Sequence, residues 1–381
     1  MKKMKIAFVC IYSTPSICGV WSRVNNLAKM LHKEGHEVAV FSTNTVKGTH
    51  EKSPISENLE GTQFYRFSPK YSFGENVKFW DFSKELEKFN PDIIIAEVYR
   101  HPHTHLALKI AKKLNKPCFL VTHAPFVPPH LRSRFGNFLS KFYDKFLGKR
   151  ILNKFDKIIT ITKWEVPYLL KIGAEKNKLG YIPNGIPEEF FSSPPKKGKN
   201  ILFLGRISPV KQLETLIEAM GILQKKHPEI KLNLVGPSEE SYKKMLEEKI
   251  SLLNLNETVR FSPAVYELER KIKILDESNI FVLPSKREAM PQSLIEAMAR
   301  GKIVLASENE GTSEIIQHRK NGFLFKSGNA TELAELIDFS LNNKNQNSLK
   351  KVRQTAIKTA QKFRWEKLFV RFKSLLEDYA K

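Results

Sequence analysis

The stretch ILFLGRISPVK, residues 201–211, predicts how the second half of the chain folds. An apolar run is followed by a glycine turn with two cations, and a helical pattern begins after it. In open parallel α/β sheets, ligands bind beyond the carboxyl ends of strands, where turn amides and helix N-termini favour anions. Arg206 can fork onto phosphate oxygens, and Lys211 can add a point charge. Taken alone, the stretch also fits an ordinary strand-to-helix turn with two surface cations.

Apolar runs and segments of helical period alternate along nearly the whole chain, which is typical of parallel sheets with crossover helices. In the first half we expect strands at 5–11, 37–42, 63–67, 92–96, 117–122 and 157–161, and helices at 21–34, 104–114 and 163–172. In the second half we expect strands at 200–204, 230–235, 258–261, 279–283, 303–306 and 323–325, and helices at 211–226, 239–253, 267–275, 291–300, 331–342 and 347–362. The pattern predicts an α/β protein with two Rossmann-like, doubly wound domains.

A polar, proline-rich connection separates the two α/β units. The 381-residue length also exceeds what one hydrophobic core usually fills. We therefore expect an N-terminal domain over 1–193 and a C-terminal domain over 199–363. Apolar residues at helical spacing near the C-terminus predict one more amphipathic helix, within 364–381, whose packing partner the pattern does not identify.

A second anion-binding signal lies in PSKREAMPQSLIEAMARG, residues 284–301. A strand ends before it, and we expect a helix that opens with proline at its first position and stops at a glycine. Glu296 sits among apolar helix neighbours, where a carboxylate needs a partner such as the hydroxyls of a ribose. Glu288, on the loop, is placed to approach a sugar or its phosphates. A nest for a diphosphate is expected in the backbone around Met290, Pro291, Gln292 and Ser293.

These motifs together resemble the retaining, group 1 family of glycosyltransferases with the GT-B fold, in which two Rossmann-like domains face a cleft. The resemblance rests on Gly205-Arg206 with Lys211, the Glu288 and Glu296 pair, Asn321-Gly322-Phe323-Leu324-Phe325 and Pro183-Asn184-Gly185. It implies that Arg206 and Lys211 bind the donor diphosphate, Glu296 the ribose, and Glu288 the neighbourhood of the transferred sugar. It also implies that the terminal helix crosses back to the N-terminal domain.

The N-terminal half offers two further candidates. Gly19 stands in the loop after the first strand, where the family often has two adjacent glycines; Cys18 replaces the other one and narrows the space near a phosphate or acceptor. His123 follows the strand at 117–122, and the resemblance places a sugar-contacting, catalytic histidine there. The loop is not a GxGxxG dinucleotide fingerprint, which disfavours a dehydrogenase.

Composition limits the remaining possibilities. A formal charge of +23 predicts attraction to something anionic, although a lysine-rich solvated surface also explains it. Three cysteines form neither a disulfide framework nor a CxxC pair, and no apolar run is long enough to span a membrane. We expect a cytoplasmic protein with no cofactor and no metal, since no Asp-x-Asp is present to hold one.

Residues 128–157 form a basic amphipathic segment. Eight cations and only two aspartates are interspersed with phenylalanine, leucine and isoleucine. Such a helix suits the surface of an anionic membrane, on the inner face of the cell membrane, but it also fits a helix whose apolar stripe packs on the domain core. The membrane interpretation favours a lipid-linked acceptor.

The leading hypothesis is transfer of a hexose-type sugar from a nucleoside-diphosphate sugar to a glycan or lipid-linked acceptor, with retention of configuration. A GT-B-fold sugar-nucleotide epimerase or hydrolase would use the same nucleotide grip without an acceptor. A non-enzymatic nucleic-acid-binding protein would explain the charge. No recognisable nucleic-acid module is present, so we expect no nucleic-acid partner.

Overall fold

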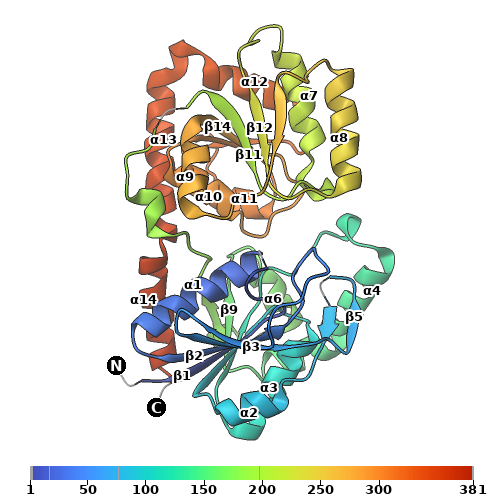
Figure 1. Cartoon of the computed structure of the whole chain (residues 1–381), viewed down its shortest axis with the longest axis vertical. Helices are drawn as coiled ribbons and strands as arrows, with labels where there is room; N and C mark the ends of the chain where they lie inside the picture. Colours follow the sequence, from blue (N-terminus) through green and yellow to red (C-terminus); the bar gives the residue numbers. More distant parts are fainter. Residues whose placement is uncertain (1–2, 17, 76, 197, 380–381) are drawn as a thin grey trace. The chain divides into compact units, whose positions relative to one another are not determined.

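The computed structural model describes residues 3–16, 18–75, 77–196 and 198–379 (Figure 1). Contacts within the chain define two compact units, one of Met1–Asn184 with Glu366–Lys381 and the other of Gly185–Trp365. The division precedes the predicted connection because Ile186 and Phe190 are buried in the core of the second unit. Phe190 belongs to the short 3-10 turn η4 (Glu188–Phe191).

The first unit is built on an eight-stranded sheet in the order β10-β9-β8-β7-β1-β2-β4-β3. All neighbours pair in parallel except β3 and β4. The strands are β1 (Lys5–Val9), β2 (Glu37–Thr43), β3 (Ser56–Leu59), β4 (Thr62–Phe67), β7 (Ile93–Glu97), β8 (Cys118–Val121), β9 (Lys157–Thr160) and β10 (Leu179–Tyr181). A separate hairpin consists of β5 (Tyr71–Phe73) and β6 (Val77–Phe79). Central strands such as β1 and β7 are almost wholly apolar because parallel strands are covered on both faces.

Helices connect and cover these strands. They are α1 (Gly19–Lys33), α2 (Ser83–Phe89), α3 (Pro102–Leu114), α4 (Arg134–Tyr143), α5 (Lys149–Leu152) and α6 (Val166–Ile172); a π turn, η2 (Asp144–Gly148), joins α4 to α5. The terminal helix α14 (Trp365–Glu377) belongs to this unit from Glu366 onward, as the resemblance predicted. Lys373 on α14 pairs with Glu34 at 2.6 Å.

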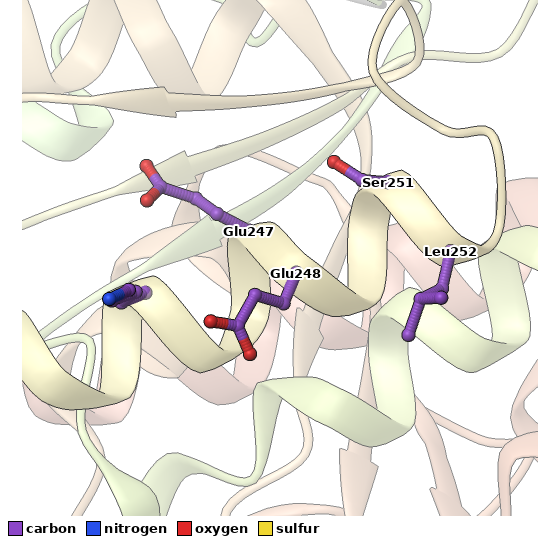
Figure 2. Close-up of a pocket in the computed structure, with 5 residues that line it drawn as sticks. Glu247, Glu248, Ser251 and Leu252 are labelled. Atoms are coloured by element: carbon purple, nitrogen blue, oxygen red, sulfur yellow. The ribbon is translucent and has the colours of Figure 1, made fainter.

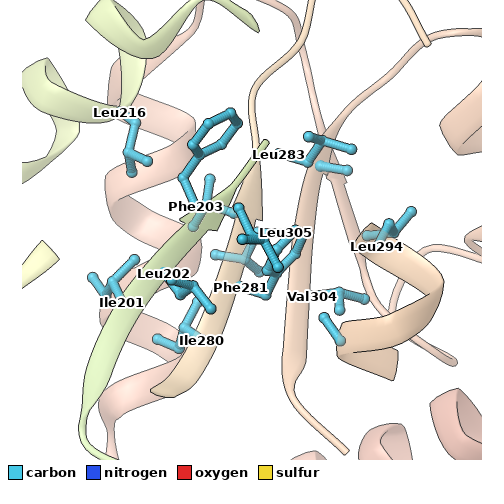
Figure 3. Close-up of a cluster of buried hydrophobic side chains, with 14 of the residues drawn as sticks. Ile201, Leu202, Phe203, Leu216, Ile280, Phe281, Leu283, Leu294, Val304 and Leu305 are labelled. Carbon is cyan, nitrogen blue, oxygen red and sulfur yellow. The ribbon is translucent and has the colours of Figure 1, made fainter. Parts of the chain in front are cut away.

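The second unit has a six-stranded, fully parallel sheet in the order β13-β12-β11-β14-β15-β16. Its strands are β11 (Asn200–Leu204), β12 (Leu232–Val235), β13 (Val259–Ser262), β14 (Ser278–Leu283), β15 (Ile303–Ser307) and β16 (Phe323–Phe325). Its helices are α7 (Leu213–Leu223), α8 (Glu240–Leu252), α9 (Leu268–Glu277), α10 (Gln292–Ala299), α11 (Glu310–Ile315), α12 (Ala330–Leu341) and α13 (Gln346–Ala360). Figure 3 shows side chains of β11, β14 and β15 packed against Leu216 of α7 and Leu294 of α10.

Strand order identifies where a ligand site belongs in each unit. Relative to chain order, the second sheet runs 3-2-1-4-5-6, and its winding reverses between β11 and β14. The first sheet reverses in the same way between β1 and β7. Loops beyond the carboxyl ends of these strand pairs are therefore the candidate sites. In the described part of the chain, no helix is long and apolar enough to cross a membrane.

Candidate functional site

The two anion-binding motifs of the second unit meet at its switch point. The amide of Lys286, beyond β14, donates to the carbonyl of Val210, beyond β11, at 2.9 Å. The turn after β12 touches the same place: a Cβ added to Gly236, which has φ +149°, would lie 1.9 Å from the carbonyl oxygen of Gly205. Backbones from three strand ends therefore meet at one point, and there is no room for a side chain at Gly236.

Lys211 and Glu288, predicted from separate motifs, are in direct contact. Lys211 Nζ lies 2.6 Å from Glu288 Oε1, and the Ser285 hydroxyl donates to the same oxygen at 2.6 Å. The helix predicted to begin at 211 begins instead at Leu213, because Gln212 adopts the left-handed conformation with φ 50°. Lys211 therefore ends a short 3-10 turn, Pro209–Lys211. Its side chain is mostly buried, with 19% exposed.

The other predicted phosphate ligands lie on the same two chain segments as Lys211 and Glu288. Arg206 lies half-buried on the loop after β11. Pro291 precedes α10 with ψ 98° rather than occupying its first turn, so the predicted start of that helix shifts by one residue, to Gln292. Among the described residues, no side chain caps this N-terminus, and the first-turn amides of a helix lack intrahelical partners. The backbone of Met290, Gln292 and Ser293 thus stands at an uncapped helix N-terminus beside Glu288.

Glu296 is buried inside α10, with one oxygen partnered and one not. Its residue is 6% exposed, and Oε1 accepts from Lys271 Nζ at 2.9 Å. Among the described residues, Oε2 has no hydrogen-bond partner. A buried carboxylate oxygen without a partner is costly, so this atom suits a ligand hydroxyl.

A short helix that the sequence did not predict fixes the loop around Glu288. Asn309 caps α11, accepts from the amide of Glu288 at 3.3 Å and donates to the carbonyl of Ser285 at 3.1 Å. A Cβ on Gly311 would lie 2.4 Å from the carbonyl oxygen of Glu288. The missed signal was Asn309 three residues before Thr312, an N-cap pattern.

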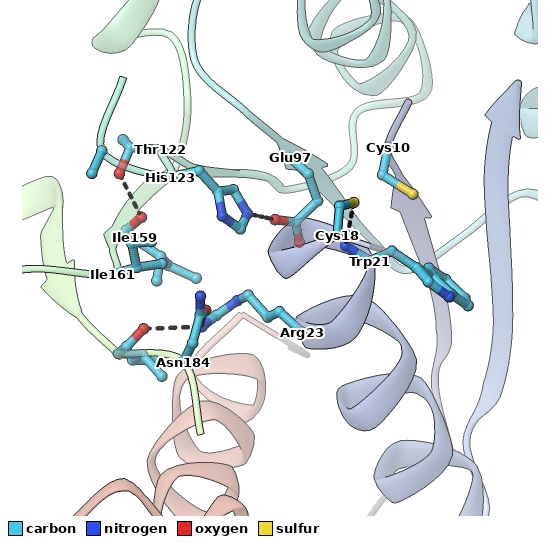
Figure 4. A network of polar contacts seen from close by, with 12 residues as sticks. Cys10, Cys18, Trp21, Arg23, Glu97, Thr122, His123, Ile159, Ile161 and Asn184 are labelled. Atoms are coloured by element: carbon cyan, nitrogen blue, oxygen red, sulfur yellow. Dashed lines mark hydrogen bonds and ion pairs between the residues drawn. The ribbon is translucent and has the colours of Figure 1, made fainter. Parts of the chain in front are cut away.

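In the first unit, His123 lies just beyond β8 in a left-handed conformation, with φ 58°. Its Nε2 lies 2.5 Å from Oε2 of Glu97, which ends the neighbouring strand β7 (Figure 4). Against a carboxylate, the ring nitrogen is the donor. Glu97 is fully buried, and among the described residues its Oε1 has no hydrogen-bond partner. Sequence reasoning missed Glu97; the available signal was a lone carboxylate directly after the apolar run 93–96.

A second buried carboxylate shapes the loop that carries His123. Glu165 accepts from the Thr122 hydroxyl at 2.6 Å and from the amides of Ala124 and Ile161 at 3.0 and 2.8 Å. Burial raises the pKa of the Glu165 carboxyl above its ordinary value. This carboxylate holds the ends of β8 and β9 together, and it was also missed from the sequence.

Arg23 of α1 is buried beside this network. It donates to the carbonyl of Ile182 at 3.0 Å. It also donates to the side chain of Asn184 at 3.2 Å (Figure 4). Burial lowers the pKa of the Arg23 guanidinium, while the charges of Glu97 and Glu165 act in the opposite direction. The Asn184 side chain of the Pro183-Asn184-Gly185 motif thus has a partner inside the first unit.

Gly19 differs from its predicted setting. We expected a loop glycine ahead of a helix starting near 21, but Gly19 is the first residue of α1. Cys18 takes the N-cap position, where its sulfur accepts from the amide of Trp21 at 3.5 Å. Ile17, also in the predicted loop, lies outside the described residues. A further hollow lies on α8 (Figure 2), and its lining residues Lys244, Glu247, Glu248, Ser251 and Leu252 all come from this one helix.

Comparison with known proteins identifies both halves of the chain. Residues 186–363 match the model of the family described as Glycosyl transferases group 1, and residues 17–190 match that of Glycosyltransferase Family 4. An uncharacterized glycosyltransferase of Methanocaldococcus jannaschii is 29% identical over 99% of both chains. A phosphatidyl-myo-inositol mannosyltransferase of Mycolicibacterium smegmatis is 24% identical over 88% of this chain and 84% of its own.

Solved structures agree on the fold. Anabaena HepE, crystallised with UDP and glucose, superposes with a TM-score of 0.75 at 18% identity, over 98% of this chain and all of its own. A glycosyltransferase from Rickettsia africae gives a TM-score of 0.76 at 20% identity over both whole chains. The protein is a glycosyltransferase with the GT-B fold. Within that class, the part of the chain that carries the contact of Lys211 with Glu288, residues 186–363, is similar to the group 1 glycosyltransferases.

Proposed function

We propose that the second unit binds a nucleoside-diphosphate sugar and that the protein transfers a hexose from it to an acceptor. The observation that carries the proposal is the contact of Lys211 with Glu288 beside the uncapped N-terminus of α10. Lys211, Arg206 and the amides near Gln292 supply positive charge and donors suited to a diphosphate. Glu296 Oε2, buried and without a protein partner among the described residues, would accept from the ribose. HepE, which was crystallised with UDP and glucose, has the same fold.

The chemistry proposed for these residues is stabilisation of a leaving group. When the bond between the anomeric carbon and the β-phosphate oxygen breaks, negative charge builds on that phosphate, and fixed donors and cations stabilise it. The acceptor oxygen then bonds to the anomeric carbon, and its proton passes to the departing phosphate. Attack from the face of departure would retain the anomeric configuration. This route needs no metal, and we propose that none is used.

In the first unit we assign His123 to contact with the transferred sugar. Glu97 holds the ring through Nε2, which leaves Nδ1 as the nitrogen that could face a ligand. The acceptor proposed is a glycan or a lipid-linked sugar; the mannosyltransferase relative, whose name specifies phosphatidyl-myo-inositol, supports the lipid-linked choice.

A transfer assay tests the proposal. The purified protein is incubated with radiolabelled UDP-, GDP- or ADP-hexoses and a lipid extract, and label in the organic and aqueous phases is counted with and without added protein. We expect transfer from one donor to a lipid or glycan. Lys211→Ala should reduce this transfer, and Lys320→Ala should not. Release of free sugar with no acceptor product would favour a hydrolase instead. Conversion of the donor to another sugar nucleotide would favour an epimerase.

A further inference from the structure

The helix α4 presents an exposed aromatic stripe at the surface of the first unit. No residue of α4 is buried. Its exposed phenylalanines and leucine therefore do not pack on the core, whereas Tyr143 at its end packs against the core and Leu152 and Phe155 lie in it. The core packing left open by the sequence is thus found for part of segment 128–157 and not for this stripe. The exposed members are Phe135 (70%), Phe138 (63%), Leu139 (48%) and Phe142 (50%), followed by Phe146 (54%) and Leu147 (44%) in η2. Exposed apolar side chains gathered on one element indicate an interaction surface.

The stripe is ordered and framed by positive charge. Phe142 and Phe146 lie with ring centroids 4.7 Å apart, and Lys145 Nζ lies 5.4 Å from the ring centre of Phe146. Exposed cations on the same helical stretch are Arg134, Lys141, Lys145, Lys149 and Arg150. The acidic residue of this stretch, Asp144, is engaged by Arg100 at 2.5 Å. The outward charge of the stretch is therefore positive.

The hairpin β5–β6 supplies a second exposed aromatic group. Tyr71 and Phe73 are each 69% exposed, Phe79 is 40% exposed, and the rings of Phe73 and Phe79 lie 6.1 Å apart. Hairpin and helix are neighbours, because Val77 and Phe79 of the hairpin and Tyr143 of α4 line one hollow of about 530 Å³. Two elements distant in sequence thus each contribute an aromatic side chain, Phe79 and Tyr143, to the lining of one hollow.

We propose that α4–η2 and the β5–β6 hairpin form one docking surface for an anionic lipid bilayer. Aromatic rings insert at the boundary between headgroups and acyl chains, and lysines and arginines bind acidic headgroups. A nucleic acid would be attracted by the same charge, but the number of protruding phenylalanines favours an apolar interior beneath the anionic layer. The inference goes beyond the transfer reaction and does not depend on the identity of the donor.

Vesicle flotation tests the proposal on the full chain. Vesicles of phosphatidylglycerol with phosphatidylcholine, or of phosphatidylcholine alone, are mixed with wild type, Tyr71→Ser/Phe73→Ser, Phe138→Ser/Phe142→Ser, or the control Ile222→Ser/Leu252→Ser. The control removes exposed apolar residues from the second unit, where Ile222 is 54% and Leu252 82% exposed. Thermal unfolding of each variant shows whether it is folded.

Wild type and control are expected to float with the anionic vesicles, and each first-unit pair should reduce the bound fraction by roughly fivefold or more. High salt should weaken binding of wild type. If the folded Tyr71→Ser/Phe73→Ser variant bound anionic vesicles as the wild type does, the hairpin would not be part of the docking surface. No binding of wild type to anionic vesicles, or an oligonucleotide that competes it off them completely, would overturn bilayer docking altogether.

Discussion

Lys211 and Glu288 are 77 residues apart in sequence, yet the Lys211 ammonium lies 2.6 Å from the Glu288 carboxylate. The contact joins the loop after β11 to the loop after β14, the two strands between which the sheet reverses its winding. A cation that pairs with a carboxylate at such a point can exchange part of that interaction for a phosphate, while the carboxylate keeps its bond from Ser285. The pair therefore positions both groups before a donor binds.

Loss of the Lys211 cation should reduce transfer strongly. Lys211→Ala removes a charge proposed to stabilise the leaving diphosphate, and we expect kcat to fall by about 10²-fold. Initial rates of sugar transfer over a range of donor concentrations measure this change. Lys320→Ala, at an exposed lysine of the same unit, should keep the wild-type rate. A wild-type rate for Lys211→Ala would remove this residue from the mechanism.

Glu296→Gln should weaken recognition of the ribose. The Gln amide would place an N–H donor where the Glu296 carboxylate oxygen is proposed to accept from a ribose hydroxyl. We expect the affinity for the nucleoside diphosphate to fall about tenfold. Titrations with the preferred nucleoside diphosphate and with its 2′-deoxy form distinguish this role, because discrimination between the two should shrink in the variant. The matched control is Glu335→Gln, an exposed position on α12. Unchanged discrimination would mean that Glu296 does not contact the sugar hydroxyls.

His123→Ala should lower kcat by about 10²-fold and leave nucleotide affinity unchanged, since the donor diphosphate is proposed to bind in the other unit. Glu97→Gln should have a smaller effect and alter the pH profile of the rate, because Glu97 holds the ring rather than the substrate. His130→Ala, at an exposed histidine further along the same loop, serves as control. If His123→Ala lost nucleotide binding instead, the assignment would be wrong.

Acid should destabilise the first unit through its buried histidines. Burial lowers the pKa of His103 to about 3, from an ordinary value of 6.5. The unfolded chain takes up this proton near pH 6.5 and the folded unit only near pH 3, so stability is full above pH 6.5 and falls as pH decreases through that window. Each such proton contributes a slope of about 1.4 kcal/mol per pH unit. His103→Gln should show a shallower loss in urea unfolding between pH 7 and pH 4, and an equal slope would contradict this account.

Gly236→Ala should damage the second unit. The new Cβ would lie 1.9 Å from the carbonyl of Gly205 in a backbone conformation, φ +149°, that side chains rarely adopt. We expect a loss of about 2–4 kcal/mol in unfolding free energy, measured by denaturant unfolding. Gly221→Ala, within helix α7, is the control. Its Cβ would lie at an ordinary 3.5 Å from the side chain of Leu253. Similar stabilities of the two variants would show that the strand ends are more adaptable than the structure indicates.

The sequence predicted the central elements of both sheets because their strands are long apolar runs between helical segments. The short elements β3, β5, β6, β10, α2 and α11 were not predicted, since each spans only three to seven residues and such a pattern is too short to repeat. The starts of α7 and α10 were misplaced by one or two residues because Gln212 and Pro291 adopt conformations that pattern alone does not reveal.

The candidate site was predictable where a motif is continuous and not where packing completes it. Lys211, Glu288 and Glu296 stand in recognisable runs, so the motifs taken together, with the family resemblance they support, were sufficient to select them as candidates. Their partners Ser285, Asn309 and Lys271 are ordinary polar residues whose importance comes from the tertiary contacts they make. Glu97 was missed for the same reason, because its relation to His123 depends on two strands being neighbours in the sheet.

Binding of UDP, GDP and ADP to the purified protein, followed by calorimetric titration, tests the central claim most directly. The account predicts that one of these diphosphates binds to the wild type, that Lys211→Ala and Glu296→Gln weaken the binding, and that Lys320→Ala does not. The proposed donor site would be contradicted if none of the three diphosphates bound to the folded wild-type protein. It would also be contradicted if both site variants left the binding unchanged.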